Sequence, residues 1–174
     1  MRIFTEIDPH TIDNDPRVVF VFEEYLEDIN RSWFLYLLKD NDHFIWASKD
    51  IIPAKNGMPP ELSGNSFLEF PVSGLQWFIE TLEQKFFKTE AEGGLPKDQF
   101  SYDEIIDGEH LCVSRMFGTP GYGFRNYSRQ DHVWEDDDDD DPQQADLSDE
   151  LLFEKGLFEK FKEVAKQLAQ SSPI

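Results

Sequence analysis

The chain has 174 residues, a net charge of −20 and a single cysteine, Cys112. This length is enough for one domain with a hydrophobic core, and one cysteine excludes an intramolecular disulfide and any zinc site built on several cysteines. The acidic surplus opposes binding to phosphate backbones and favours a basic partner, although solubility alone would also explain it. The sequence opens without a signal peptide and contains no apolar run near the roughly 20 residues of a membrane span, so we expect a cytoplasmic protein without membrane contact.

The first part of the chain is rich in β-branched and aromatic residues at strand spacing. We expect an edge strand over residues 2–7 and strands over 17–25, 31–39 and 43–48. The tight turn at residues 40–42 joins the last two strands as a hairpin. A loop marked by Pro59 and Pro60 is expected over residues 49–64.

Residues 65–88 combine a short strand, Pro71 and an amphipathic helix. Ser73 and Gln76 have the spacing of a capping box, and Val72 and Trp77 occupy the positions of a hydrophobic staple. Apolar residues then recur at helical spacing and predict a helix with one apolar face: Leu75, Phe78, Ile79, Leu82 and Phe86.

The second part contains an acidic connection over residues 89–108 and a second hairpin formed by residues 110–117 and 122–129. Residues 135–147 are expected to be a flexible acidic linker, and residues 148–170 a C-terminal helix that Gly156 interrupts. The fold class predicted for the single domain, residues 1–174, is α+β. It consists of an antiparallel sheet covered by two helices, in a β-β-β-β-α-like repeat arrangement.

The segments RSWFLYLLKDNDHFIWAS and NSFLEFPVSGLQWFIETLEQKFF together resemble a PUR-type repeat, and the related Whirly fold has the same element order. The resemblance covers about residues 17–88. It implies a curved sheet that binds single-stranded nucleic acid through basic and aromatic side chains. The first strand departs from that pattern, because it ends in Glu23 and Glu24 where basic residues are expected. The matching strand positions are Arg31, Trp33, Tyr36, Phe44 and Trp46.

Residues 110–130 contain three arginines and no acidic residue. Arg125, Tyr127 and Arg129 alternate along one predicted strand and would share a face, a combination that grips a nucleic-acid backbone while bases stack. With Arg115 they form the candidate nucleic-acid site. Two alternatives stay open: the arginines pair with the protein's own carboxylates, or the aspartate run occupies the patch as a nucleic-acid mimic.

Motifs for catalysis, cofactors or metals do not stand out in the sequence. No HExxH, GxSxG, P-loop or GxGxxG pattern occurs, and the aspartate run lacks the offsets and turn glycine of a calcium loop. His110 and Cys112 would share a strand face, but no second pair completes a tetrahedral metal site. We therefore expect no enzyme activity, no cofactor and no bound metal.

The leading hypothesis is a non-enzymatic acidic protein that binds a basic protein partner such as a toxin or nuclease. The chain is similar in style to bacterial immunity proteins, which implies an inhibitor that acts as a DNA mimic. An exposed aromatic residue beside carboxylates would anchor the partner. The expected partner-binding residues form one patch around the aspartate run and a second acidic patch at and after the end of the strand over residues 17–25: Trp134, Glu135, Asp136, Asp137, Asp138, Asp139, Asp140 and Asp141, with Glu23, Glu24, Glu27 and Asp28. The alternative is a PUR- or Whirly-like protein that binds single-stranded DNA or RNA and carries an acidic regulatory tail.

Overall fold

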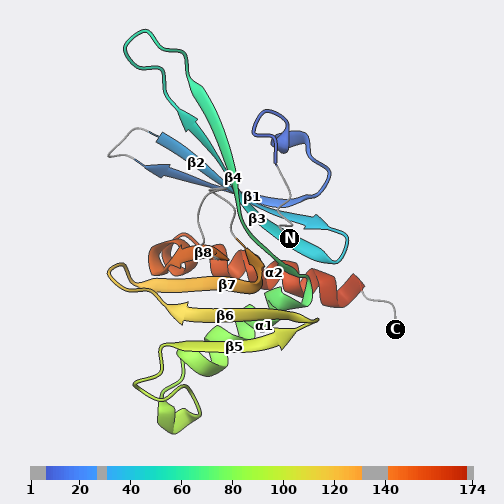
Figure 1. Ribbon diagram of the computed structural model, residues 1–174, viewed down its shortest axis with the longest axis vertical. Coiled ribbons are helices and arrows are strands. Elements are labelled where there is room, and N and C mark those ends of the chain that lie inside the picture. The colour runs from blue at the N-terminus through green and yellow to red at the C-terminus, as the bar shows by residue number, and fades with distance from the viewer. Residues whose placement is uncertain (1–6, 27–30, 131–140, 172–174) are drawn as a thin grey trace.

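A computed structural model describes residues 7–26, 31–130 and 141–171. The strands form two four-stranded antiparallel sheets with the orders β1-β2-β3-β4 and β5-β6-β7-β8 (Figure 1). One helix follows each sheet, so the order of four strands and a helix occurs twice. The bounds are β1 (Val18–Leu26), β2 (Arg31–Asp40), β3 (His43–Ile52), β4 (Glu61–Pro71), α1 (Ser73–Thr81), β5 (Ser101–Ile106), β6 (Glu109–Arg115), β7 (Gly121–Gln130), β8 (Pro142–Ser148) and α2 (Leu157–Ser171).

The predicted mixture of antiparallel strands and helices is confirmed, but the strands form two sheets instead of the one expected. β3 and β4 extend into the loop that was expected over residues 49–64, so only residues 53–60 remain between the two strands. Two strands, β5 and β8, were not predicted. Residues 142–147, expected to belong to the linker, form most of β8. Inward-facing and outward-facing residues alternate along this strand, but the inward position 143 holds a buried glutamine instead of an apolar residue, so the sequence pattern did not predict a strand. The expected strand over residues 2–7 lies almost wholly outside the described residues.

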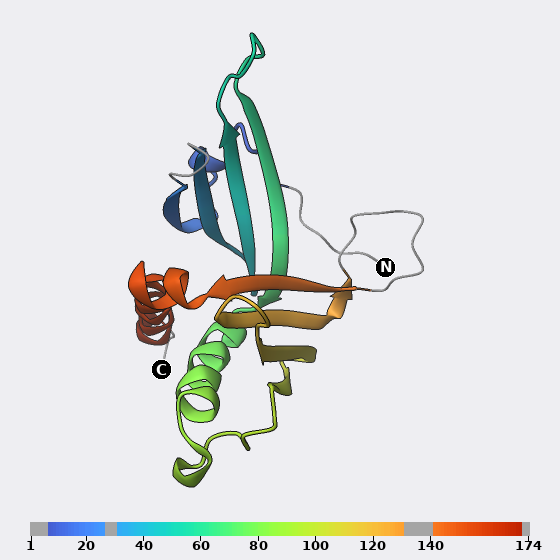
Figure 2. The same cartoon turned by 90° about the vertical axis from the view of Figure 1, so that its left-hand side faces the viewer.

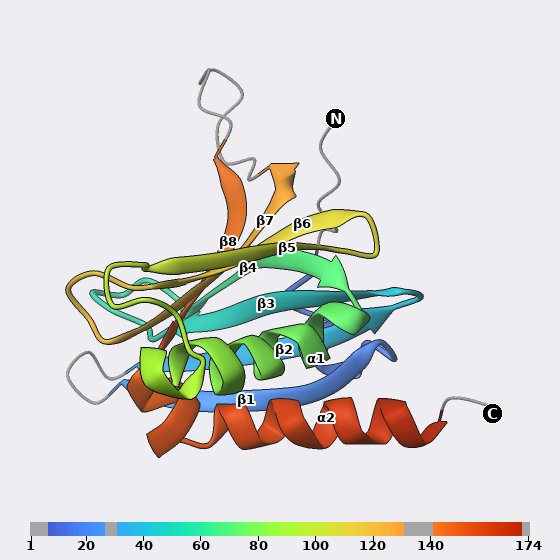
Figure 3. The same cartoon turned by 90° about the horizontal axis from the view of Figure 1, so that it is seen from below.

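Each helix packs mainly on the sheet that it does not follow in sequence. Phe78 of α1 stacks on Phe124 of the second sheet with 4.8 Å between ring centroids. Phe161 of α2 contacts the first sheet, with ring centroids 6.0 Å from Phe20 and 5.6 Å from Trp46. The two helices lie side by side (Figure 3). The prediction of one sheet covered by two helices is therefore met only in part. Two covering helices are present, but each packs on the sheet of the other repeat, an arrangement referred to as the exchange of helices.

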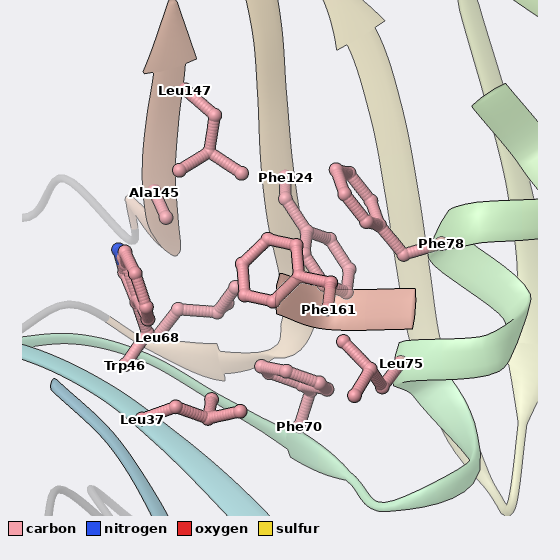
Figure 4. A pocket seen from close by; sticks show the side chains of 10 residues that line it. All are labelled: Leu37, Trp46, Leu68, Phe70, Leu75, Phe78, Phe124, Ala145, Leu147 and Phe161. Atoms are coloured by element: carbon pink, nitrogen blue, oxygen red, sulfur yellow. The ribbon is translucent and has the colours of Figure 1, made fainter. Parts of the chain in front are cut away.

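The exchanged helices and the inner faces of both sheets enclose one apolar core. The first sheet stands upright and the second lies across its lower end, and side chains from both sheets meet in the angle between them (Figure 2). Only a void of about 10 Å³ remains at the centre, too small and too apolar to hold water. The residues around it come from seven different elements (Figure 4): Leu37, Trp46, Leu68, Phe70, Leu75, Phe78, Phe124, Ala145, Leu147 and Phe161.

The start of α1 differs from the predicted capping box. Val72 already has helical backbone angles and occupies the N-cap, and no side chain caps the helix there. The Ser73 hydroxyl instead donates to the carboxylate of Asp107, and the Gln76 amide donates to Glu80 Oε1 at 2.7 Å. The helix continues past α1 as a π-helical turn over Leu82–Phe86.

The predicted C-terminal helix consists of two pieces. A π-helical turn over Glu150–Glu154 comes first, and α2 begins after Gly156, whose φ of +85° ends that turn. Among the described residues, no helix combines the length and the apolar character that a bilayer span needs.

The other face of the first sheet carries a second, smaller apolar cluster that includes Tyr36 and Ile45. A 3₁₀ turn over Ile12–Asn14 supplies Ile12 to this cluster. Asp13 of the turn accepts a hydrogen bond from the Tyr36 hydroxyl at 2.7 Å and pairs with Lys49. This part of the first sheet is therefore covered on both faces.

Candidate functional site

Within the described part of the chain, no helix covers the outer face of the second sheet, because both helices lie on its inner side (Figure 2). Phe124 and Leu147 point into the core, and their strand neighbours alternate with them and point outward. The register places Cys112 opposite Arg125, and Arg125 opposite Gln144. This outer face is mostly polar, and we take it as the candidate site.

An open hollow of about 510 Å³ lies on this face and is referred to as the Tyr127 depression. Tyr127 is 48% exposed. The Arg125 guanidinium donates to Gln144 Oε1 and to Ser114 Oγ, so its partners there are neutral. The Gln144 amide in turn donates to the carboxylate of Asp146. The lining consists of Arg125, Tyr127, Asp141, Pro142, Gln144 and Asp146.

A second group of polar residues adjoins the depression. His110 Nε2 lies 2.6 Å from Asp103 Oδ2, and the imidazole lies 5.1 Å from the Tyr127 ring. Cys112 is buried beside them, and burial raises the pKa of its thiol, which a hydrogen bond from Tyr127 offsets only in part. A protonated, buried thiol is a poor nucleophile, so this group does not form a catalytic cysteine site.

Most of the predicted acidic patch lies outside the described residues: Trp134, Glu135, Asp136, Asp137, Asp138, Asp139 and Asp140, together with Glu27 and Asp28. Asp141 is described, and it lines the Tyr127 depression. β7 ends at Gln130, which pairs with Pro142 at the start of β8. The acidic run therefore belongs to the connection between the two strands that border the depression.

Glu23 and Glu24 do not form a joint patch, because neighbouring residues of β1 point to opposite faces of the first sheet. The Glu24 carboxylate accepts a hydrogen bond from Lys155 at 2.6 Å, and its side chain is only 13% exposed. Glu23 is exposed on the other face. The prediction of a second acidic patch therefore fails for these two residues.

The three predicted arginines are also separated. Arg115 lies over the Phe86 ring, 5.3 Å from its centroid, at the opposite end of β6 and away from the depression. An irregular register between Asn126 and Gln130 breaks the alternation of β7, and Arg129 turns to the inner side. Only Arg125 and Tyr127 share the outer face, so the expectation that Arg129 joins them is wrong.

Arg129 belongs to a buried polar cluster that joins the two sheets, referred to as the junction network. Its guanidinium donates two hydrogen bonds to Glu109, at 2.8 and 2.9 Å, and one to Glu69 of the first sheet. Asn126 donates to Glu109 at 2.6 Å and to the Glu69 carbonyl at 2.8 Å. His43 Nε2 lies 2.6 Å from Glu109 Oε1.

Burial, hydrogen bonds and ion pairs in the junction network shift the pKa values of its members, including Glu109 and His43. Burial raises the pKa of Glu109, but hydrogen bonds from Arg129, His43 and Asn126 outweigh it and bring the pKa to about 2. Burial lowers the pKa of His43, and its contacts with Glu109 and Asp42 outweigh that effect and raise the pKa above its usual value. The network therefore holds an ionised carboxylate at the contact between the sheets and favours a protonated imidazole beside it.

Of the residues that the PUR resemblance implies, Tyr36, Phe44 and Trp46 are buried and unavailable for base stacking. Trp33 is half-buried, and nothing is described for the side chain of Arg31. Asp103, His110 and Asp146 adjoin the site but were not among its predicted residues; His110 was considered only as a possible metal ligand. The signal for Asp146 was the alternation of β8, where Gln143, Ala145 and Leu147 are buried and Asp146 is exposed.

No group of three or more His, Cys, Asp or Glu residues suited to a metal ion occurs within the described ranges. No protein-family model, curated protein or solved structure matches this chain.

Proposed function

We propose that this chain is a non-enzymatic protein that binds a basic protein partner through the outer face of the second sheet. Its biological form would be an inhibitor or immunity protein of a nuclease or another nucleic-acid-binding protein. The observation that carries this proposal is the Tyr127 depression: a half-exposed aromatic ring and the carboxylates of Asp141 and Asp146 line one hollow, next to the two strands that the acidic run connects. An aromatic anchor within opposite charge is a frequent arrangement at protein interfaces.

The ion pairs elsewhere in the molecule support this assignment, because many cations are already neutralised. Arg17 pairs with Asp15 and Asp40, while Lys155 and Lys162 pair with glutamates. Arg129 is enclosed by Glu69 and Glu109. With 36 acidic against 16 basic side chains, the unpaired surplus that faces solvent is negative and would steer a cationic protein toward the chain.

The test compares association rates of a captured partner with three forms of the full chain. The site variant replaces residues 136–141 by Asn. The control variant, Glu61→Gln with Glu90→Gln and Asp98→Asn, removes exposed carboxylates elsewhere. We expect the site variant to bind at least about tenfold more slowly at low salt, with a flatter salt dependence, and the control to change little. Equal association rates for the site variant and the unmodified chain would reject the proposal.

Single-strand binding of the PUR or Whirly type is a second candidate, supported by Arg125 beside the exposed ring of Tyr127. The twofold occurrence of four strands and a helix also supports this relationship. The carboxylates of Asp141 and Asp146 in the same depression weigh against it, because they repel phosphates. A low-salt titration with a single-stranded oligonucleotide, on the full chain and on the site variant, tests this candidate. Absence of binding by both forms would remove it.

A further inference from the structure

A separate groove of about 180 Å³ lies between the two sheets, on the opposite side of β8 from the Tyr127 depression. Trp33, Trp46 and Phe67 line it from the first sheet, and β8 forms its other wall. Trp46, Ala145 and Leu147 separate it from the centre of the core (Figure 4). At about 30 Å³ per water molecule, this volume corresponds to only a few waters. The groove is therefore large enough for one long side chain but smaller than the pockets that bind drug-sized ligands.

The walls of the groove combine aromatic rings with one carboxylate, that of Asp146. Glu24, the neighbour of Trp33 on β1, is already paired with Lys155 and adds no free charge there. Asp146 of β8 lines both the groove and the Tyr127 depression, as does Gln144. The groove and the depression are therefore separate hollows that share these two residues of β8.

Aromatic rings beside a carboxylate favour a cationic side chain as the occupant of the groove. The face of an indole attracts a cation, and a planar guanidinium stacks on it better than a compact ammonium does. The methylene stem of such a side chain would pack on Phe67 and Leu35, which also line the groove. A carboxylate side chain would meet Asp146 and be repelled, and an apolar side chain would gain nothing from the charged rim.

We propose that this groove binds one arginine side chain of the basic partner, while neighbouring cations of the partner contact the Tyr127 depression. The inference rests on the proposed function and adds the anchoring residue type and its place. Trp33 supplies the ring against which the guanidinium stacks, and Asp146 supplies the opposite charge where the groove meets the depression.

The experiment uses Nα-acetyl-arginine amide as the probe and its neutral isostere Nα-acetyl-citrulline amide as the matched control. The indole N–H signals of Trp33 and Trp46 are followed by NMR in the full chain at 0.15 M salt. We expect the arginine probe to shift both signals with saturation, while the signal of Trp77, which donates to Glu104 at 2.9 Å on another part of the molecule, stays unchanged. Trp33→Leu should lower the affinity for the arginine probe roughly 2- to 30-fold, which is the range expected for the loss of a cation–π contact.

Two further variants separate this inference from the proposed function. Asp146→Asn should lower the affinity for the arginine probe severalfold. Asp141→Asn removes a carboxylate that lines only the depression and should leave this affinity unchanged. Equal binding of the citrulline probe, or an equal effect of the two Asn variants, would overturn the arginine site. If Trp33→Leu leaves the affinity for a captured basic partner unchanged, the site is likewise overturned, but the proposed function stands. If the arginine probe binds as expected and the site variant loses no association rate, the proposed function fails and the groove remains an arginine site.

Discussion

Replacing Arg129 by Met tests whether the junction network holds the two sheets together. The Arg129 side chain is 12% exposed and its partners Glu69 and Glu109 are 3% and 15% exposed, so the substitution leaves two carboxylates with little water and no guanidinium. Removal of one partner from a buried ion pair costs about 3–5 kcal/mol, and we expect that loss in the free energy of unfolding at pH 7. Urea denaturation followed by tryptophan fluorescence measures it.

The pH dependence of this loss identifies its cause. Arg129 contributes most to the lowered pKa of Glu109, so without it this carboxylate takes up a proton more readily, and the difference between the variant and the unmodified chain should shrink between pH 7 and pH 5. Lys160→Met provides the control, because the Lys160–Glu163 pair is 47% and 63% exposed and should contribute at most about 1 kcal/mol. A loss below about 1 kcal/mol for Arg129→Met, independent of pH, would show that solvent screens the network and would refute the reasoning.

Three other predictions concern the pH range of stability, the core and one backbone position. A protonated His43 stabilises the fold below its ordinary pKa of about 6.5, and this contribution is lost as the pH rises through its raised folded-state pKa. His43→Gln should therefore lose less stability than the unmodified chain between pH 6 and pH 9, and equal losses would contradict this. Phe124→Ala should cost about 3–5 kcal/mol in urea denaturation, against less than about 0.5 kcal/mol for Phe117→Ala, whose ring is 83% exposed. Gly156→Ala should lower the thermal midpoint through a strain of about 1–2 kcal/mol at φ +85°, and Gly156→Asn should lower it less, because Asn tolerates this conformation; equal midpoints would exclude strain there.

Periodicity predicted the elements whose apolar residues are dense, and it missed those in which polar residues are buried or exposed rows are acidic. β2 and β3 have continuous buried runs: β2 was predicted to within one residue, and β3 from its correct start but four residues too short. β8 was missed because the buried residue Gln143 is polar, and its side-chain oxygen accepts a hydrogen bond from the Glu69 backbone N–H at 2.8 Å within the core. Such a contact depends on a strand 74 residues away in the chain, which no local pattern reveals.

The candidate site was only partly accessible to the same reasoning. Arg125 and Tyr127 share a face because β7 is regular up to Asn126. The bulge that follows turns Arg129 into the junction network, and only the position of Glu69 on the neighbouring sheet shows why the arginine is stable there. The acidic residues of β5 and β8 that adjoin the site, Asp103 and Asp146, carried no signal of their own in a chain with 36 acidic residues.

The exchange of helices between the repeats sets an order for biosynthesis. Phe20 and Trp46 belong to the first strands to be synthesised, yet Phe161, which covers both, comes from the last helix. A nascent chain that has completed the first sheet therefore still exposes aromatic surface to solvent, a state that is prone to aggregation. We expect the growing polypeptide to recruit a chaperone until α2 leaves the ribosome and docks.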